Sequence, residues 1–81
     1  MTIGTRRDFE LHELQPGEYG KNTLGVWHCR PPWQHAGGCL ARHTVVEHED
    51  GTITVSPSIL IEQPPLGTWH GYLERGVWRE C

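Results

Sequence analysis

A chain of 81 residues with 36% hydrophobic residues suffices for one small domain, with too few apolar residues for a large core. Its net charge is −3, and its seven basic residues are spread along the chain with only Arg6 and Arg7 adjacent, which argues against the clustered basic stripe of a nucleic-acid-binding surface. No apolar run approaches the ~20 residues that span a bilayer, so we expect no membrane partner and no nucleic-acid partner.

The expected compartment is intracellular. The segment MTIGTRRDFE lacks the apolar core of a signal peptide. The three cysteines, Cys29, Cys39 and Cys81, form an odd set, which disfavours a secreted disulfide framework. We therefore expect reduced thiols, metal ligands or a mixture of both.

Residues 1–22 read as a polar segment that precedes the main domain. Phe9 and Leu11 alternate with polar residues, a pattern that allows an edge strand ended by Gln15-Pro16-Gly17. The alternative is a partly disordered terminus. Residues 23–81 are predicted to form a single β domain, and its first strand is predicted over Thr23–Arg30.

The clearest architectural signal lies between residues 44 and 55. A long strand over Cys39–Glu49 is predicted to enter a tight turn at Asp50-Gly51, and two β-prone runs joined by Asp-Gly are typical of a hairpin. Ser56-Pro57-Ser58 then interrupts the pattern, because proline has no N–H to donate. Ile59–Ile61 is therefore predicted as a separate third strand.

A second hairpin is predicted over residues 68–80, with its turn at Arg75-Gly76. Glycine or proline interrupts almost every window longer than about ten residues, so no ordinary helix is predicted. The predicted fold is all-β, a small antiparallel barrel or a two-layer sandwich of five or six short strands.

Nine cysteine and histidine residues supply many nitrogen and sulfur donors for a metal. A structural zinc site needs four such ligands around a tetrahedron. The candidate ligands are Cys29, Cys39, His43, His70 and Cys81. The alternative is that the cysteines are small buried residues and the histidines lie at the surface.

Nucleophilic catalysis has little support in the sequence. His28 and Cys29 are adjacent, and adjacent side chains of a strand point to opposite faces, so they are not partners; a cross-strand pair of Cys29 with His43 stays open. Ser56 and Ser58 lack the strand-to-helix elbow of a hydrolase. We expect no complete catalytic constellation.

Acidic residues gather at the tip of the first hairpin. Glu47, Glu49 and Asp50 surround His48 there. We interpret them as a solvated hairpin end; the alternatives are a weak cation site or an acidic contact patch.

The four tryptophans divide between core and surface. Trp27 and at least one of Trp69 and Trp78 are expected in the core, because each aromatic ring buries ~150–250 Å². Trp33 lies in the loop PPWQHAGG and is the tryptophan that we expect to be exposed. The candidate contact residues for a protein partner are Trp33, Trp69, His70 and Tyr72.

Three features together resemble a known family: DGTITVSPSILI (residues 50–61), WHGYLERGVW (residues 69–78) and the preceding His43. They are similar to small uncharacterised proteins of tailed phages, especially actinobacterial phages, and to a broader bacterial and prophage family of unknown function. The resemblance implies a phage origin and a location in the host cytoplasm. It implies no activity.

The matching positions in the two motifs are Ser56, Pro57, Ser58, Ile59, His70, Tyr72 and Gly76, with Cys29 and Cys81 as loose matches. Trp69 stands where the broader family has a cysteine, and Arg30-Pro31-Pro32 stands where a second early cysteine would be. If the family's cysteines bind zinc, this chain keeps only part of the ligand set.

The sequence therefore predicts a non-enzymatic phage accessory protein that binds another protein, either a host factor or a second copy of itself. A homo-oligomer would help a thin core by burying a strand edge or Trp33. The alternative is a small metalloprotein with a structural zinc held by cysteine and histidine.

Overall fold

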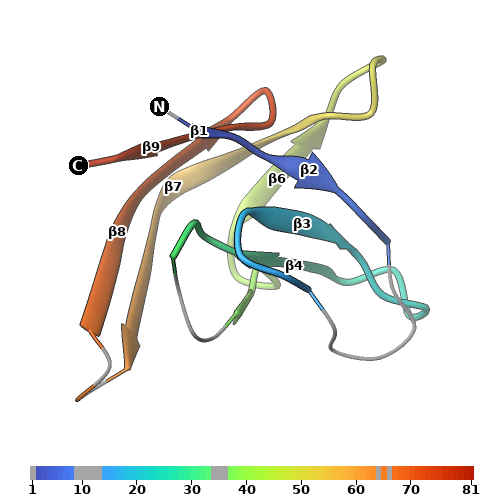
Figure 1. Ribbon diagram of the computed structural model, residues 1–81. Helices are drawn as coiled ribbons and strands as arrows, with labels where there is room; N and C mark the ends of the chain where they lie inside the picture. The colour runs from blue at the N-terminus through green and yellow to red at the C-terminus, as the bar shows by residue number, and fades with distance from the viewer. Residues whose placement is uncertain (1, 9–13, 34–36, 64, 66) are drawn as a thin grey trace.

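The structure, a computed structural model, describes residues 2–8, 14–33, 37–63, 65 and 67–81. Within these ranges the chain forms nine strands and no helix, which confirms the all-β prediction. The strands form two packed sheets that do not close into a barrel, so the fold is a two-layer sandwich (Figure 1). In the described part of the chain, no helix has the length and apolar character to cross a membrane.

The larger sheet is antiparallel throughout. Its strand order is β1 (Thr2–Ile3), β9 (Val77–Glu80), β8 (Gly67–Glu74), β7 (Ile53–Gln63) and β6 (Thr44–Glu47). The smaller sheet has the order β2 (Thr5–Arg6), β3 (Glu18–Lys21), β4 (Trp27–Arg30) and β5 (Gly38–Cys39). In the smaller sheet β2 runs parallel to β3, in contrast to the antiparallel prediction. Nine strands replace the predicted five or six because several contain only two residues.

Both predicted hairpins are present, β6–β7 and β8–β9. At the first turn the Gly51 N–H donates to the His48 carbonyl (3.0 Å), and the His48 N–H donates to the Thr52 carbonyl (2.8 Å). Gly51 has φ +87°, which glycine adopts readily. At the second turn Arg75 and Gly76 both have positive φ, as the favoured two-residue hairpin turn requires.

β7 continues as one strand through the predicted interruption at Ser56-Pro57-Ser58. The strand register shifts there, because Val55 pairs with Leu73 whereas Ile59 pairs with Gly71. The bulge absorbs the proline and returns both Val55 and Ile59 to the buried face. The predicted third strand over residues 59–61 is thus a continuation of β7.

Two other predicted strands are shorter than expected. Of Thr23–Arg30, only Trp27–Arg30 is strand, because the Asn22 Oδ1 accepts the N–H groups of Leu24 (3.0 Å) and Val26 (3.0 Å) and folds a turn before it. The predicted strand over 39–49 divides into β5 and β6, because Leu40 turns into the core between them.

The core lies between the two sheets and contains both rings of the last hairpin, Trp69 and Trp78. Their centroids are 5.5 Å apart in an edge-to-face arrangement. The other members of the buried cluster are Tyr19, Cys29, Leu40, Ile53, Val55, Ile59 and Leu73, and Trp27 packs against it as a partly buried residue.

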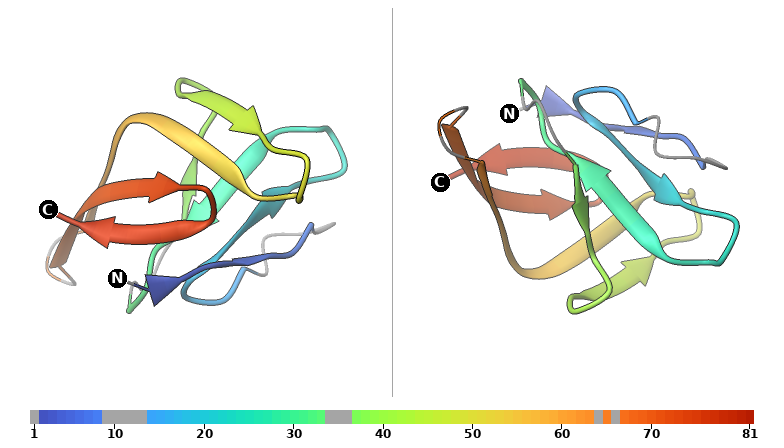
Figure 2. Two further views of the ribbon diagram at one scale, coloured as in Figure 1. Left: turned by 90° about the horizontal axis from the view of Figure 1, so that it is seen from above. Right: turned by 90° about the horizontal axis from the view of Figure 1, so that it is seen from below.

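The start of the chain crosses from the larger sheet to the smaller one (Figure 1, Figure 2). Gly4 lies at the crossing and donates its N–H to the Gly76 carbonyl (2.7 Å). A Cβ at Gly4 would lie 2.7 Å from the Trp78 Nε1, so the crossing needs glycine. Strands β1, β2 and β3 all come from residues 1–22 and pair within this sandwich, whereas the predicted edge strand at Phe9 and Leu11 falls outside the described residues.

Candidate functional site

Trp33 is the exposed tryptophan, as the sequence predicts, with 78% of its surface accessible. It follows Pro31 and Pro32, which are both buried and whose rings fix their own φ angles. Trp33 itself has φ 64°, a left-handed conformation that is rare for a bulky residue. A rigid, anchored backbone therefore presents this ring to solvent.

Trp33 stands between two shallow depressions, and Pro32 and Thr2 line both of them. The first, of about 200 Å³, is also lined by Trp69, Trp78 and Glu80. The second, of about 170 Å³, is also lined by Ile3, Thr5, Pro16 and Gly17. Ile3 is 84% exposed and shares this depression with Trp33. We call the group Thr2, Ile3, Pro32 and Trp33 the Trp33 surface.

The floor of the first depression is held rigidly. The Trp78 Nε1 donates to the Gly17 carbonyl at 2.9 Å, and the Trp78 ring packs edge-to-face against Trp69. Trp69 and Trp78 are almost fully buried, so they support the depression from beneath, and a partner would contact chiefly the Trp33 ring beside it. The Glu80 carboxylate lies at the rim of this depression and gives it a polar border.

The other predicted contact residues do not form an exposed surface together with Trp33. Trp69 is only 2% exposed and belongs to the core, so it is not the surface contact that the sequence predicts. Along β8 the buried side chains alternate with exposed ones, which places His70 and Tyr72 on the outer face of the larger sheet. Tyr72 carries the Arg79 guanidinium 5.8 Å from its ring centroid.

The predicted zinc ligands do not converge. Cys29 and Cys39 lie on neighbouring strands of the smaller sheet, whereas the Cys81 N–H, just after β9, donates to the carbonyl of His70 on β8 of the larger sheet. The His43 Nε2 lies 3.3 Å from the Ser58 carbonyl oxygen, and the His70 Nε2 lies 2.9 Å from the Ser58 Oγ, so these two histidines share a neighbour. Among the described residues, which include all five candidates, no three metal-binding side chains meet.

The thiol that the sequence offers as a nucleophile is buried. Cys29 is fully covered, and burial raises the pKa of its thiol to about 12. The thiolate is the reactive form of cysteine, so this side chain is inert at neutral pH. Cys39 and Cys81 are exposed.

A serine–histidine pair is present that the sequence reasoning missed. The His70 Nε2 lies 2.9 Å from the Ser58 Oγ across β7 and β8. In the part of the chain that the structure describes, no carboxylate orients the His70 ring, so the pair lacks the third member of a Ser–His–acid arrangement. Ser58 lies at the register shift between Val55 and Ile59 of β7, and no sequence motif marks its proximity to His70.

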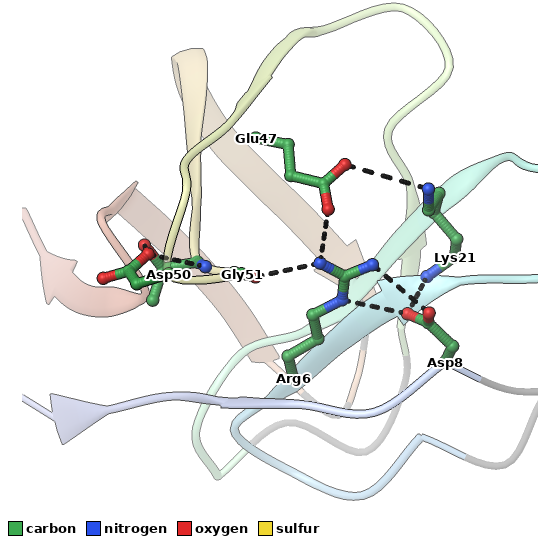
Figure 3. A network of polar contacts seen from close by, with 7 residues as sticks. Arg6, Asp8, Lys21, Glu47, Asp50 and Gly51 are labelled. Carbon is green, nitrogen blue, oxygen red and sulfur yellow. Dashed lines mark hydrogen bonds and ion pairs between the residues drawn. The ribbon is translucent and has the colours of Figure 1, made fainter.

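A second missed feature is an ion network between the β6–β7 hairpin and the smaller sheet (Figure 3). The Arg6 Nη1 contacts the Glu47 Oε2 at 2.6 Å, and the Arg6 Nε and Nη2 contact the two Asp8 oxygens at 3.2 Å each. The Lys21 Nζ lies 3.8 Å from Glu47. We call these four residues the Arg6 cluster; it joins the β6–β7 hairpin to the smaller sheet.

The Arg6 cluster changes the interpretation of the acidic hairpin tip. Hydrogen bonds from Arg6 lower the pKa values of the Asp8 and Glu47 carboxyls and raise the pKa of the guanidinium. The Trp27 ring lies beneath both cations, 5.0 Å from Arg6 and 5.2 Å from Lys21. Glu47 is therefore a structural ion-pair partner and not part of a free acidic patch.

No protein-family model, curated protein or solved structure matches this chain.

Proposed function

We propose that this chain is a non-enzymatic protein-binding module whose contact surface is the Trp33 surface. The observation that carries the proposal is the 78% exposure of Trp33 on an anchored, left-handed backbone. An exposed ring held by a rigid backbone loses little conformational entropy when it is buried, and tryptophan is enriched among the residues that dominate binding energies. Ile3 extends the same apolar surface on the other side of the shared depression.

The size of the depressions favours a protein over a small molecule. Sites for small ligands are concave and enclose about 300–1,000 Å³. The hollows beside Trp33 measure about 200 and 170 Å³ and are open. They suit single side chains of a partner that packs around the projecting ring.

A binding role is also supported over a catalytic one by the state of the candidate nucleophiles. The Cys29 thiol is buried, and its raised pKa keeps it protonated. The Ser58–His70 pair belongs to the open face of a sheet, where His70 is exposed, so it lacks the water-excluding cleft that strengthens catalytic interactions.

The motifs at residues 50–61 and 69–78 support a more specific proposal. Through their resemblance to small tailed-phage proteins, we place this module in the host cytoplasm as an accessory protein. Its partner would be a host protein that presents an apolar or aromatic side chain to the Trp33 surface.

The test compares capture by three immobilised chains: wild type, Trp33→Ala and Leu24→Ala. Leu24 is an equally apolar exposed residue in the turn before β4, outside both depressions, and serves as the matched control. A protein captured from actinobacterial host lysate is identified, purified and titrated against each chain. We expect Trp33→Ala to weaken its affinity by about thirty-fold or more, equivalent to about 2 kcal/mol.

Leu24→Ala should leave this affinity within about two-fold of the wild type. Equal affinity of the wild type and Trp33→Ala for every captured protein would contradict the proposal.

A further inference from the structure

We propose that two copies of this chain associate through the free edges of β6, which pair antiparallel across a two-fold axis at Val46 and join two larger sheets into one. The surface is separate from the Trp33 surface, because β1 lies at one edge of the larger sheet and β6 at the other (Figure 2). The inference goes beyond the proposed function and does not depend on it.

The first support is the unpaired backbone of β6. The His48 N–H donates to the Thr52 carbonyl, and hydrogen-bonded positions alternate along an antiparallel pair. The N–H and C=O groups of Thr44 and Val46 therefore point to β7, whereas those of Val45 and Glu47 point away from the sheet. An edge of this kind is a template for a further strand.

The space beside this edge is open. A depression of about 380 Å³ adjoins the start of β6 and is lined by Gly25, Val26, Trp27, Leu40, Ala41, His43 and Val45. No described strand pairs with the outer edge of β6. Among the described strands, none therefore occupies the position beside the outer edge of β6.

The register between β6 and its copy follows from the backbone groups that are free to form hydrogen bonds. If Val46 faces Val46 of the second copy, Val45 faces Glu47 of the second copy, and each such pair exchanges two hydrogen bonds. The N–H and C=O groups of Val45 and Glu47 then all form hydrogen bonds in each copy. A register centred on Val45 would instead pair Glu47 with His43, whose N–H already donates to the Leu40 carbonyl at 3.0 Å.

The side chains select a second copy as the occupant. Arg42 lies in the turn just before β6, and Glu49 and Asp50 lie in the turn just after it, so in this register the basic end of each copy lies towards the acidic end of the other. Arg42 is exposed and forms no ion pair with any described residue. The edge runs from a basic end to an acidic end, so an antiparallel copy of itself is its electrostatic complement.

Val46 supplies the apolar centre of the interface. It is half exposed at 50%, and the register makes it a non-hydrogen-bonded pair with its symmetry mate, in which side chains approach most closely. The Val46 side chains of the two copies, each exposed in its monomer, would then cover one another on the outer face of the joined sheet.

The first test measures mass by sedimentation from about 10 µM to about 1 mM. The mass should rise from 9.2 kDa towards twice that value. Val46→Lys places two like charges across the axis, and it should raise the dissociation constant about ten-fold or more. Leu60→Lys is the matched control, because Leu60 is 55% exposed on the same face but lies on β7. The dissociation constant of the Leu60→Lys variant should stay within about three-fold of the wild-type value.

The second test fixes the register without relying on a destabilising charge. In a Cys39→Ser/Cys81→Ser background, Val46→Cys puts two thiols on positions with a Cα separation of about 4.5 Å, within disulfide range. Thr44→Cys is equally on the outer face, but its two thiols would be about 13 Å apart. Mild oxidation should cross-link the first variant and leave the second without a disulfide between its copies.

Three results would overturn the proposal. They are a wild-type monomer at every concentration, equal effects of Val46→Lys and Leu60→Lys, and equal cross-linking of Val46→Cys and Thr44→Cys. Tryptophan fluorescence of each variant verifies that it is folded before its mass is measured.

Discussion

Replacing Gly71 with alanine should strongly destabilise the sandwich, because the added methyl group would overlap atoms of the core. Gly71 points into the core from β8, between Trp69 and Leu73. A Cβ there would lie 2.3 Å from the Arg79 carbonyl oxygen, 2.7 Å from the Trp69 Cη2 and 2.9 Å from the Glu80 Cα. Two of these three atoms belong to the backbone, so no change of rotamer relieves the overlap.

The magnitude follows from the cost of overpacking. An extra methylene in a filled core costs about 1–3 kcal/mol, and the two backbone contacts place Gly71→Ala at the upper end, about 3 kcal/mol. A chain of this length has a total stability of roughly 4–12 kcal/mol. At about 4–8 °C per kcal/mol, the melting temperature should fall by about 12–24 °C.

Thermal unfolding followed by tryptophan fluorescence measures this fall, because Trp69 and Trp78 lie at the affected position. Gly38→Ala is the control: its Cβ would lie 3.3 and 3.4 Å from the tip of the Ile61 side chain, which can rotate. That variant should melt within about 4 °C of the wild type. A Gly71→Ala chain that melts within the same margin would refute the account of how β8 and β9 hold the floor beneath Trp33.

Two further predictions concern charge and thiols. The lowered pKa values of the two carboxyls in the Arg6 cluster mean that its stabilisation is present above their unfolded pKa values, near 4, and disappears as the pH falls through the lower folded values. The urea midpoint should therefore fall more between pH 6 and pH 2 in the wild type than in Arg6→Gln, and equal falls would show that the cluster does not stabilise the fold. For the thiols, Cys39 and Cys81 should react with a disulfide reagent in the native protein, and Cys29 only on unfolding. Rapid native labelling of Cys29 in a Cys39→Ser/Cys81→Ser chain would contradict its burial.

The sequence predicted the elements whose signals are local. Asp50-Gly51 and Arg75-Gly76 identified both hairpins, because these turns need residues that accept positive φ. The composition around Trp33, two prolines before and two glycines after, correctly predicted its exposure. Each of these inferences needed only a few neighbouring residues.

The features that the sequence missed depend on distant partners. Alternation grouped Trp69 with Gly71 and Leu73, but it could not say which face of β8 was buried; the packing against Trp78 decides that. Proline at 57 wrongly indicated a strand end, because the bulge that accommodates it is visible only in the pairing with β8.

The Arg6 cluster and the strands β1 and β2 were missed for the same reason. Arg6 meets Glu47 across 41 positions of sequence, and a two-residue strand carries no periodicity.

The central claim is that the Trp33 ring is the part of this chain that a partner covers. The indole N–H signals in a nitrogen-15 NMR spectrum test it directly, because Trp33 is exposed whereas the Trp78 Nε1 is bonded to the Gly17 carbonyl inside the fold. Titration with the captured partner should shift or broaden the Trp33 signal and leave the Trp78 signal in place. A complex that forms with the Trp33 signal unchanged would contradict the claim.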